Sequence, residues 1–325
     1  MAYSEQILRR ARARLEEARL QTDRENEQRI AAIYERLPRL QEIDQLLRQT
    51  ITKVMTVTFS QGGAPQEAME RLKTENLSLQ RERDWILESE GIDEQDLRND
   101  PICPACKGLG FVGERLCDCL QELCRQEQKK ELSTLLGVGK ETFDAFKLSY
   151  YPNEMDPRLG ASPRELMQMV LMKCRRYAQS FSKKSPSLLF SGGTGLGKTF
   201  LSAAIARTVA DAGFSVCYET AVQVFADFET EKFGDGNEKP AAKYQQCDLM
   251  ILDDLGTEMT TQFTQSALYT LINERLLAGL PTVVSTNLNS DELRRRYSPQ
   301  IASRLLGGYD MVQFCGTDIR FLLKQ

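Results

Sequence analysis

The eight residues from Gly192 to Thr199 read GGTGLGKT and constrain the fold of this 325-residue chain more than any other feature. The spacing G-x-x-x-x-G-K-T is typical of a phosphate-binding loop that joins a strand to the N-terminus of a helix. A strand-like run at 187–190 precedes the segment, and a helix-forming run at 200–209 follows it. Glycines let successive N–H groups turn toward one anion, and the helix dipole favours negative charge there. The sequence therefore predicts a nucleoside triphosphate site.

The residues of this loop have distinct expected roles. We expect Lys198 to reach the β- and γ-phosphates and Thr199 to offer its hydroxyl to Mg²⁺. The other residues would surround the phosphates with backbone groups: Gly192, Gly193, Thr194, Gly195, Leu196 and Gly197. The alternative is a glycine-rich turn that fits the pattern by chance, and a second motif downstream argues against it.

The second motif is DLMILDD at 248–254, where four apolar residues precede Asp253 and Asp254. Such a run predicts a strand that is buried on both faces of a parallel sheet, and ligands bind at the carboxyl ends of these strands. We expect Asp253 to bind Mg²⁺, directly or through water, and Asp254 to orient or deprotonate the attacking water. Alone, the pair would fit a solvated acidic turn equally well. Together, the two motifs predict a Mg²⁺·ATP site.

Charge and composition restrict the partners and the compartment. The net charge of −4 provides no general attraction for nucleic acid, so DNA contact would need a local patch. Two basic clusters are candidates, although both also fit solvated helix faces: Lys173, Arg175 and Arg176, and Arg294, Arg295 and Arg296. The sequence contains neither a membrane-spanning apolar run nor a signal-peptide core, so we expect a cytoplasmic protein without membrane contact. Histidine is absent, which excludes histidine ligands and histidine acid–base catalysis.

Four cysteines predict a metal site: Cys103, Cys106, Cys117 and Cys119. The C-x2-C and C-x-C pairs are separated by glycines that let the chain turn around an ion. Nine cysteines in a reducing compartment favour metal binding or free thiols over disulfides. A structural zinc ion held by four thiolates fits best. An iron–sulfur cluster and free cysteines remain alternatives, as does Cys124 in place of Cys119.

Sequence patterns divide the chain into four predicted segments. Residues 1–98 carry apolar residues at helical spacing and predict antiparallel helices, either a self-contained bundle or, as we favour, a partner-docking region. Residues 99–124 contain the cysteine-rich zinc module, and 125–141 form a polar connector. Residues 142–325 alternate between strands and helices, which predicts an α/β fold with a parallel sheet flanked by helices.

Four segments of this chain resemble those of a known family. They occur in the order GGTGLGKT, LDDLGTE, STNL and IASRL. They resemble the AAA+ ATPases of the bacterial replicative helicase loader family (DnaC/DnaI type), to which the IstB transposition helper is a near relative. TFDAF followed by YYP resembles the lead-in that this family places before its sheet. The cysteine segment resembles the zinc segment of one loader branch.

The resemblance implies further roles at the ATP site. It makes Lys198 and Thr199 the Walker A pair and Asp253 and Asp254 the Walker B pair. Asn287 becomes a sensor that holds the attacking water. These residues would support slow hydrolysis that a partner or DNA stimulates, since most AAA+ proteins have Glu where this chain has Asp254.

Two residues nearer the C-terminus also receive roles from the resemblance. Arg304 becomes an arginine finger for the γ-phosphate of a neighbouring subunit, which implies self-association through the ATP site. The alternative for Arg304 is a surface or intradomain salt bridge. The short stretch after Asn287 implies that the usual C-terminal helical lid is lacking, with Arg320 as a weak substitute for its arginine.

The resemblance finally implies a function. The N-terminal helices would bind a hexameric replicative DNA helicase, and ATP would act as a switch for ring remodelling and delivery onto single-stranded DNA. Residues 221–246 fall where such loaders carry an extra helical element that would face DNA. Two alternatives are an IstB-like transposition helper, which acts on duplex DNA with a transposase, and a non-catalytic ATP-binding adaptor.

Overall fold

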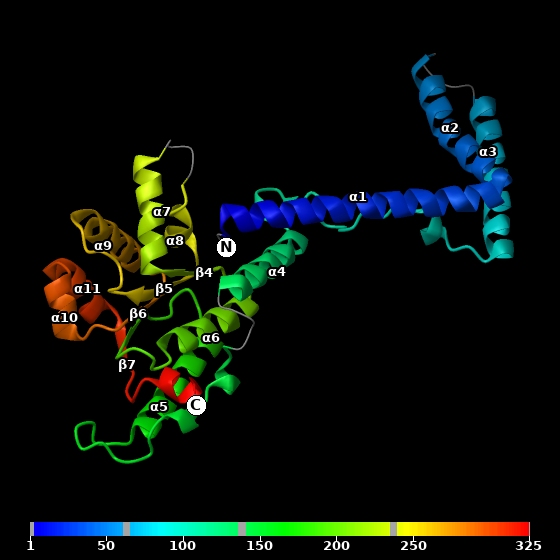
Figure 1. Cartoon of the computed structure of the whole chain (residues 1–325). Coiled ribbons are helices and arrows are strands. Elements are labelled where there is room, and N and C mark those ends of the chain that lie inside the picture. Colours follow the sequence, from blue (N-terminus) through cyan, green and yellow to red (C-terminus); the bar gives the residue numbers. More distant parts are fainter. Residues whose placement is uncertain (1–2, 61–65, 136–140, 235–238, 325) are drawn as a thin grey trace. The chain divides into compact units, whose positions relative to one another are not determined.

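The chain forms a five-stranded sheet with helices on its faces and, nearer the N-terminus, a set of long helices (Figure 1). The computed structural model describes residues 3–60, 66–135, 141–234 and 239–324. It contains two compact units. We call Met1–Arg12 together with Leu120–Gln325 the sheet unit, and Ala13–Cys119 the helical unit. Within the described ranges, no helix combines the length and apolarity that crossing a membrane requires.

The sheet unit contains a parallel sheet with the strand order β4-β5-β6-β3-β7. Its strands are β3 (Leu188–Ser191), β4 (Val216–Thr220), β5 (Leu249–Leu255), β6 (Thr282–Thr286) and β7 (Asp310–Gln313). Every residue of β3 and β6 is buried, as expected for central strands covered on both faces. The predicted parallel α/β fold is thus confirmed.

Helices cover both faces of this sheet and enclose two apolar cores. The elements are α5 (Pro163–Gln179), α6 (Lys198–Asp211), α7 (Ala221–Phe233), α8 (Ala242–Gln246), α9 (Gln262–Leu277), α10 (Ser290–Arg296) and α11 (Pro299–Gly308). Successive strand residues point to opposite faces. Leu188 and Phe190 therefore pack with α5 and α6, whereas Leu189 packs with α7, α9 and α11.

Helix α4 (Asp118–Leu135) occupies much of the segment that we expected to be a polar connector. Its Gln128 side chain donates a 2.9 Å hydrogen bond to the carbonyl of Phe214 and accepts a 3.0 Å bond from the N–H of Val216. The buried amide thus satisfies backbone groups at and just before the start of edge strand β4. This contact explains why a polar sequence forms an ordered helix here. The remainder of the predicted connector, 136–140, lies outside the described residues.

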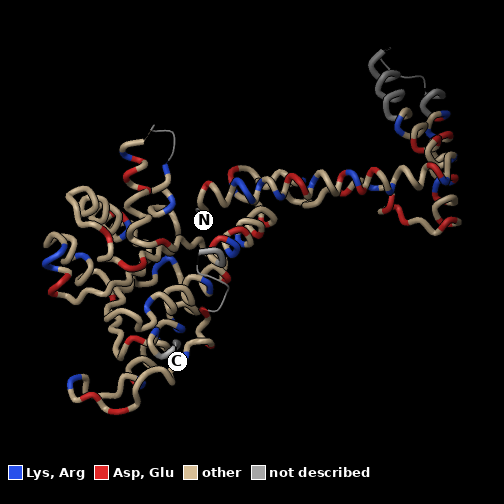
Figure 2. Tube along the Cα trace, in the orientation of Figure 1, with Lys and Arg blue, Asp and Glu red and all other residues tan. Residues whose placement is uncertain are grey.

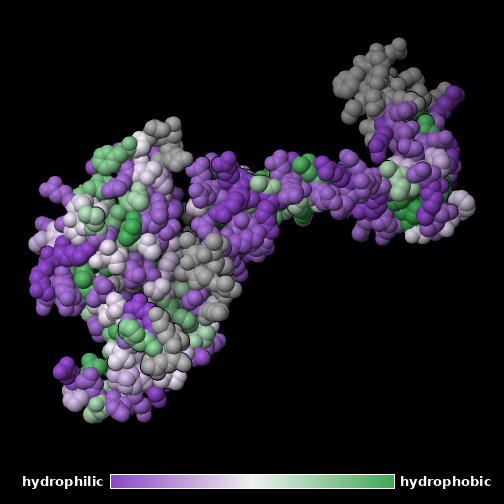
Figure 3. Space-filling model, viewed as in Figure 1, coloured by the Kyte–Doolittle hydropathy of each residue, from purple (hydrophilic) through white to green (hydrophobic). Residues whose placement is uncertain are grey.

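The helical unit confirms the expected helices near the N-terminus. Its elements include most of α1 (Glu5–Arg36), then α2 (Pro38–Ser60), α3 (Gln66–Glu90), the 3-10 helix η1 (Glu94–Leu97), β1 (Phe111–Val112) and β2 (Arg115–Leu116). Helices α2 and α3 pack as a hairpin around Leu40, Ile43, Ile86 and Leu87. Acidic and basic residues are interspersed along α1 (Figure 2), and its visible surface is mainly hydrophilic (Figure 3).

Candidate functional site

The loop that joins β3 to α6 has the conformation expected of a phosphate-binding loop. Gly195 and Gly197 have φ angles of 69° and 88°, in the left-handed region that glycine adopts without steric cost. Gly197 is the N-cap of α6, which begins at Lys198. Thr199 lies exposed in the first turn of the helix. Free N–H groups of this turn and the helix dipole therefore favour an anion at the loop.

The side chain of Lys198 is buried and folds over the loop. Its Nζ donates hydrogen bonds of 2.7 Å to the carbonyl oxygens of both Gly192 and Gly193. Desolvation lowers the pKa of Lys198, although the carboxylates of Asp254 and Asp253 oppose this shift. The ammonium group thus lies against the loop, where phosphate oxygens can take the place of the carbonyl acceptors.

Aromatic residues outside the motif support the loop from two sides. Tyr151 donates a 2.9 Å hydrogen bond to a loop carbonyl. Its hydroxyl and the ring of Phe146 both lie 3.0 Å from the position that a Cβ on Gly197 would occupy. The carbonyl oxygen of Phe314, after β7, lies 2.6 Å from the corresponding position at Gly192. The two glycines are therefore needed for close packing. Tyr151 and Phe146 lie in segments that only the family resemblance singled out, and no sequence pattern predicted a role for Phe314.

Two hydroxyl groups from neighbouring strands hold Asp253. Tyr218 of β4 donates a 2.6 Å hydrogen bond to Oδ2, and Ser285 of β6 donates to Oδ1. Asp253 is only 3% exposed, so these bonds fix the orientation of a carboxylate that little water reaches. Neither donor was predicted from the sequence. Both donors lie in the strands next to β5, but each of these strands carries other polar residues as well, so the sequence alone gave no specific signal for either donor.

Asp254 differs from Asp253 in both conformation and exposure. It is exposed and has a φ angle of 54°, which is uncommon for a residue other than glycine. Its N–H donates a 3.0 Å hydrogen bond to the Ser285 hydroxyl, where the register of β5 with β6 shifts. Partial desolvation and repulsion from Asp253 raise the pKa of Asp254. A bulge thus turns toward solvent a carboxylate that is suited to accept a proton.

Asn287 follows β6 and is exposed beside the end of β5. Its Oδ1 lies 3.5 Å from the position that a Cβ on Gly256 would occupy, and Gly256 directly follows β5. The carboxyl ends of the two strands thus bring Asn287 close to the chain segment that carries the acidic pair. This position is compatible with the predicted sensor role.

Arg304 binds to helix α9, not to the loop of its own chain. Its Nε donates a 2.8 Å hydrogen bond to Asn273, its Nη2 donates a 2.9 Å bond to the Tyr269 hydroxyl, and its guanidinium lies 4.4 Å from the centre of the Tyr269 ring. All three partner groups are neutral. The salt bridges of the described residues do not include Arg304, so the alternative of an ion pair is wrong for this part of the chain.

Both predicted basic clusters are partly neutralised. In the first, Arg175 forms a 2.7 Å ion pair with Asp144. In the second, Arg294 lies 3.8 Å from Asp291, and Arg296 donates to the backbone of Glu258. These contacts favour the interpretation of both clusters as solvated, internally paired surfaces. Within residues 221–246, α7 spans Ala221–Phe233 and α8 spans Ala242–Gln246, and 235–238 lie outside the described residues.

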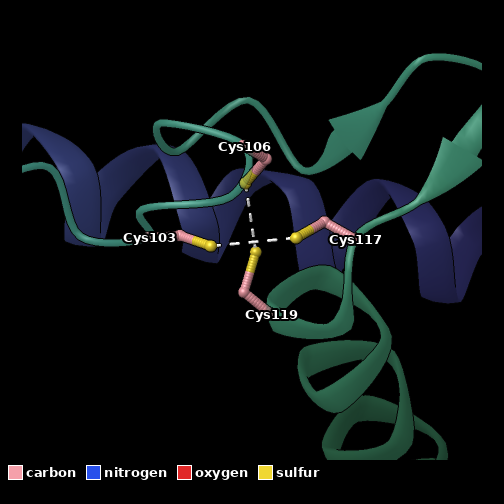
Figure 4. A group of neighbouring side chains, drawn as sticks. All are labelled: Cys103, Cys106, Cys117 and Cys119. Carbon is pink, nitrogen blue, oxygen red and sulfur yellow. Dashed lines mark hydrogen bonds between the residues drawn. The ribbon is translucent and has the colours of Figure 1, made fainter.

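The four predicted metal ligands converge within the helical unit (Figure 4). All their sulfur atoms lie within 4.8 Å of one another, with 3.7 Å between Cys103 and Cys117 and 3.4 Å between Cys106 and Cys119. A tetrahedral zinc ion with Zn–S bonds of about 2.3 Å would separate its sulfurs by about 3.8 Å. A disulfide would need an S–S distance of about 2.05 Å. The arrangement therefore fits zinc.

The backbone around these cysteines explains how they meet. A tight turn after Cys106 has positive φ at Lys107 and Gly108, and the antiparallel strands β1 and β2 return the chain to Cys117. The N–H of Gly110 donates a 3.3 Å hydrogen bond to the Cys106 sulfur, as expected for a thiolate ligand. Among the described residues, Cys119 and not Cys124 lies in the group with the other three cysteines.

Comparison with known proteins gives this geometry a family context. Residues 166–306 match the family described as IstB-like ATP binding protein. The chain is 25% identical over 137 residues to the replicative helicase loader DnaC of Escherichia coli (strain K12), covering 42% of this chain and 56% of DnaC. It is 28% identical over 116 residues to the replicative helicase loader DnaI of Bacillus subtilis (strain 168), covering 35% of this chain and 37% of DnaI.

One solved structure completes the comparison. The crystal structure of the DnaC helicase loader aligns with a TM-score of 0.45 at 17% identity, covering 55% of this chain and 98% of that one. The chain spans about half the length of the first curated relatives it matches. Part of this protein, including residues 166–306, is thus similar to IstB-like ATP binding proteins and to the helicase loaders DnaC and DnaI.

Proposed function

We propose that this protein is an ATP-dependent loader of a hexameric replicative DNA helicase. One observation carries the proposal: the phosphate loop, the acidic pair and Asn287 all lie at the carboxyl ends of the adjacent strands β3, β5 and β6. The sequence around them is similar to that of helicase loaders. ATP binding and slow hydrolysis would control when the protein holds the helicase and when it releases it onto single-stranded DNA.

Each residue of the site has a role in this proposal. The loop N–H groups and Lys198 bind the β- and γ-phosphates, and Thr199 and Asp253 hold Mg²⁺, which neutralises phosphate charge when bound. Asp254 accepts the proton of the attacking water, which Asn287 orients. The hydroxyls that hold Asp253, together with the bulge at Asp254, keep the two carboxylates in separate roles.

Arg304 acts on the nucleotide of a neighbouring copy in this proposal. Its neutral partners, Asn273 and Tyr269, position the guanidinium without cancelling its charge. The side chain is thus held in a fixed orientation between α11 and α9 and keeps its positive charge. Such an arginine suits a contact with the γ-phosphate of another subunit. Self-association through the ATP site follows from this role.

The helical unit supplies the helicase-docking region in this proposal. Among the residues whose burial is described, Leu40, Ile43, Ile86 and Leu87 form the buried core between α2 and α3. On α3, by contrast, Trp85 is 68% exposed and Leu77 is 45% exposed. Large exposed apolar side chains of this kind form the central contacts of protein interfaces. We retain residues 1–98 as the docking region, 99–124 as a zinc module that orders the chain beside it, and 142–325 as the ATPase domain.

Co-elution with a bacterial replicative helicase tests the proposal. The full chain and the helicase are mixed with ATP and Mg²⁺ and separated by size-exclusion chromatography, and unwinding of a forked DNA reports loading. We expect an ATP-dependent complex, and we expect the Lys198→Ala variant to fail in loading. A helicase that neither co-elutes with the wild-type chain nor gains DNA unwinding from it would contradict the proposal.

The IstB-like family match favours a second candidate, a transposition helper. Such a protein would assemble on duplex DNA in an ATP-dependent manner and bind a transposase. Electrophoretic mobility shifts with duplex and single-stranded DNA of equal length separate the two candidates. ATP-dependent polymers on duplex DNA, together with no binding to the helicase, would favour the transposition helper.

A further inference from the structure

The side chain of Glu258 is buried in the turn that follows β5. Only 4% of it is exposed, and its Oε2 accepts a 2.7 Å hydrogen bond from the N–H of Gly256, the residue directly after the strand. In the same turn, the Thr257 hydroxyl donates a 2.9 Å bond to the carbonyl oxygen of Asp254. A buried carboxylate is costly unless its oxygens have partners. The conformation of the turn after Asp254 therefore depends on how this carboxylate is held.

The other oxygen of the Glu258 carboxylate faces helix α10. Oε1 accepts a hydrogen bond from the hydroxyl of Tyr297, a buried residue at the C-terminal cap of this helix. Arg296, the last residue of α10, donates from Nη2 to the carbonyl oxygen of Glu258, and its Nε lies 3.9 Å from Oε1. The same helix end thus holds both the side chain and the backbone of Glu258. One buried residue therefore joins the end of β5 to α10.

The turn that Glu258 fixes lies beside two residues of the proposed reaction. Gly256 comes two positions after Asp254. The position that a Cβ on Gly256 would occupy lies 3.5 Å from Oδ1 of Asn287 and 2.8 Å from the side chain of Leu288. A displaced turn would therefore move Asp254 and press on the segment that carries Asn287. Such a change matters for the chemistry, because a misplacement of about 1 Å can lower a rate about a hundredfold.

The contacts of Glu258 separate it from the groups that would bind phosphate. In the described part of the chain, its hydrogen bonds and its ion pair involve the turn after β5 and α10, and none of them involves the phosphate loop. We propose that Glu258 is a positioning residue for ATP hydrolysis, which holds Asp254 and Asn287 in place from its anchor on α10 without touching the nucleotide. The inference rests on the proposed hydrolysis of ATP. Glu258 should therefore contribute to kcat and not to ATP binding.

The test compares ATP binding with ATP hydrolysis in the full chain. Calorimetry measures the Kd for Mg²⁺·ATP, and phosphate release at saturating ATP gives kcat. Glu258→Gln keeps the shape of the side chain but leaves one acceptor oxygen where there were two, so it loses the bond either to Gly256 or to Tyr297. We expect kcat to fall about tenfold or more, while Kd stays at the wild-type value.

A second variant tests whether the anchor on α10 is the cause. Tyr297→Phe removes only the hydroxyl and keeps the charge of Glu258, so we expect a smaller fall in kcat at unchanged Kd. The two effects should not add in the double variant, because both act through the same contact. If Glu258→Gln does not fold, Tyr297→Phe decides alone. A fall in its kcat at unchanged Kd then supports the inference, and wild-type kcat overturns it.

Glu127→Gln is the matched control, because it also neutralises a buried glutamate. The Glu127 side chain lies on α4, is 6% exposed and pairs with Lys130 at 2.9 Å. This variant should keep wild-type kcat and Kd, whatever it changes in thermal unfolding. Three outcomes would overturn this inference alone: wild-type kcat in Glu258→Gln, a loss of ATP binding in it that matches the loss of hydrolysis, or an equal fall in kcat in the control. A wild-type chain that neither binds nor hydrolyses ATP would overturn the proposed function as well.

Discussion

Tyr218 donates a 2.6 Å hydrogen bond to Asp253 on the adjacent strand, and both residues are buried. Tyr218→Phe would leave the carboxylate with only Ser285 as a hydroxyl donor. Because a hydrogen bond to a charged group contributes about 1.5–3 kcal/mol, we expect Mg²⁺·ATP affinity to fall about tenfold or more. Titration with a fluorescent ATP analogue, with and without Mg²⁺, measures this change.

A second tyrosine provides the matched control for that variant. Tyr177 is buried, and its hydroxyl has no hydrogen-bond partner among the described residues. Tyr177→Phe removes the same atom without touching the acidic pair and should leave nucleotide affinity unchanged. Equal affinities of the Tyr218→Phe and wild-type proteins for Mg²⁺·ATP would show that the hydrogen bond from Tyr218 to Asp253 does not contribute to nucleotide binding.

Lys198 and Asp254 should fail at different steps. Lys198→Ala removes the ammonium that faces the phosphates, so we expect it to lose ATP binding. Asp254→Asn keeps the shape of the side chain but cannot accept a proton, so we expect near-normal binding with hydrolysis reduced about a hundredfold or more. Parallel binding and phosphate-release assays distinguish the two. Hydrolysis at the wild-type rate in Asp254→Asn would assign the base to another residue.

The raised pKa of Asp254 predicts the acidic side of the pH profile. A carboxylate whose pKa is raised becomes protonated at a higher pH than usual, so kcat/KM for ATP should fall as the pH drops through that raised value. Arg320 opposes the shift. Arg320→Ala should therefore move the acidic limb to still higher pH, while Arg98→Ala should leave it in place. An unshifted limb in Arg320→Ala would mean that Asp254 does not sense this arginine.

The cysteine cluster predicts about one zinc ion per chain by mass spectrometry. Cys106→Ala removes a ligand and should abolish zinc binding, with loss of ordered structure in the helical unit, because structural zinc contributes about 10 kcal/mol to folding. Cys124→Ala, outside the cluster, should retain the metal. Metal content below half of one equivalent in the wild-type protein would exclude zinc as a structural component.

Arg304→Ala should abolish stimulated hydrolysis and spare nucleotide binding, because the side chain contacts α9 and not the loop of its own chain. Asn273→Ala removes a partner that positions the guanidinium and should cause a smaller loss. The measurement is ATP turnover with helicase and single-stranded DNA at several protein concentrations. Stimulation that survives intact in Arg304→Ala would exclude the contact in trans.

The fold and the main site residues were predictable because local sequence encodes them. The glycine spacing before Lys198 dictates a loop with left-handed residues, and the apolar run before Asp253 dictates a buried parallel strand. Both signals arise within a few residues. Both features can therefore be recognised without any knowledge of tertiary contacts.

The supporting contacts were not predictable in the same way. Gln128 satisfies edge groups of a strand more than eighty positions away, and its segment was expected to be a connector. The Ser285 hydroxyl donates to the carboxylate of Asp253 and accepts from the backbone N–H of Asp254 at the point where the register of β5 with β6 shifts. Such relationships depend on strand order and bulges, which periodicity does not reveal.

The aromatic props beneath the phosphate loop bear on how the protein can be dissected. Tyr151 precedes the stretch that matches the IstB-like family, and Phe314 follows it. A fragment cut to residues 166–306 would retain both nucleotide-binding motifs, Asn287 and Arg304, and yet leave the glycines of the loop without the rings and backbone that brace them. An ATPase fragment for expression should therefore start before Phe146 and extend beyond Arg320.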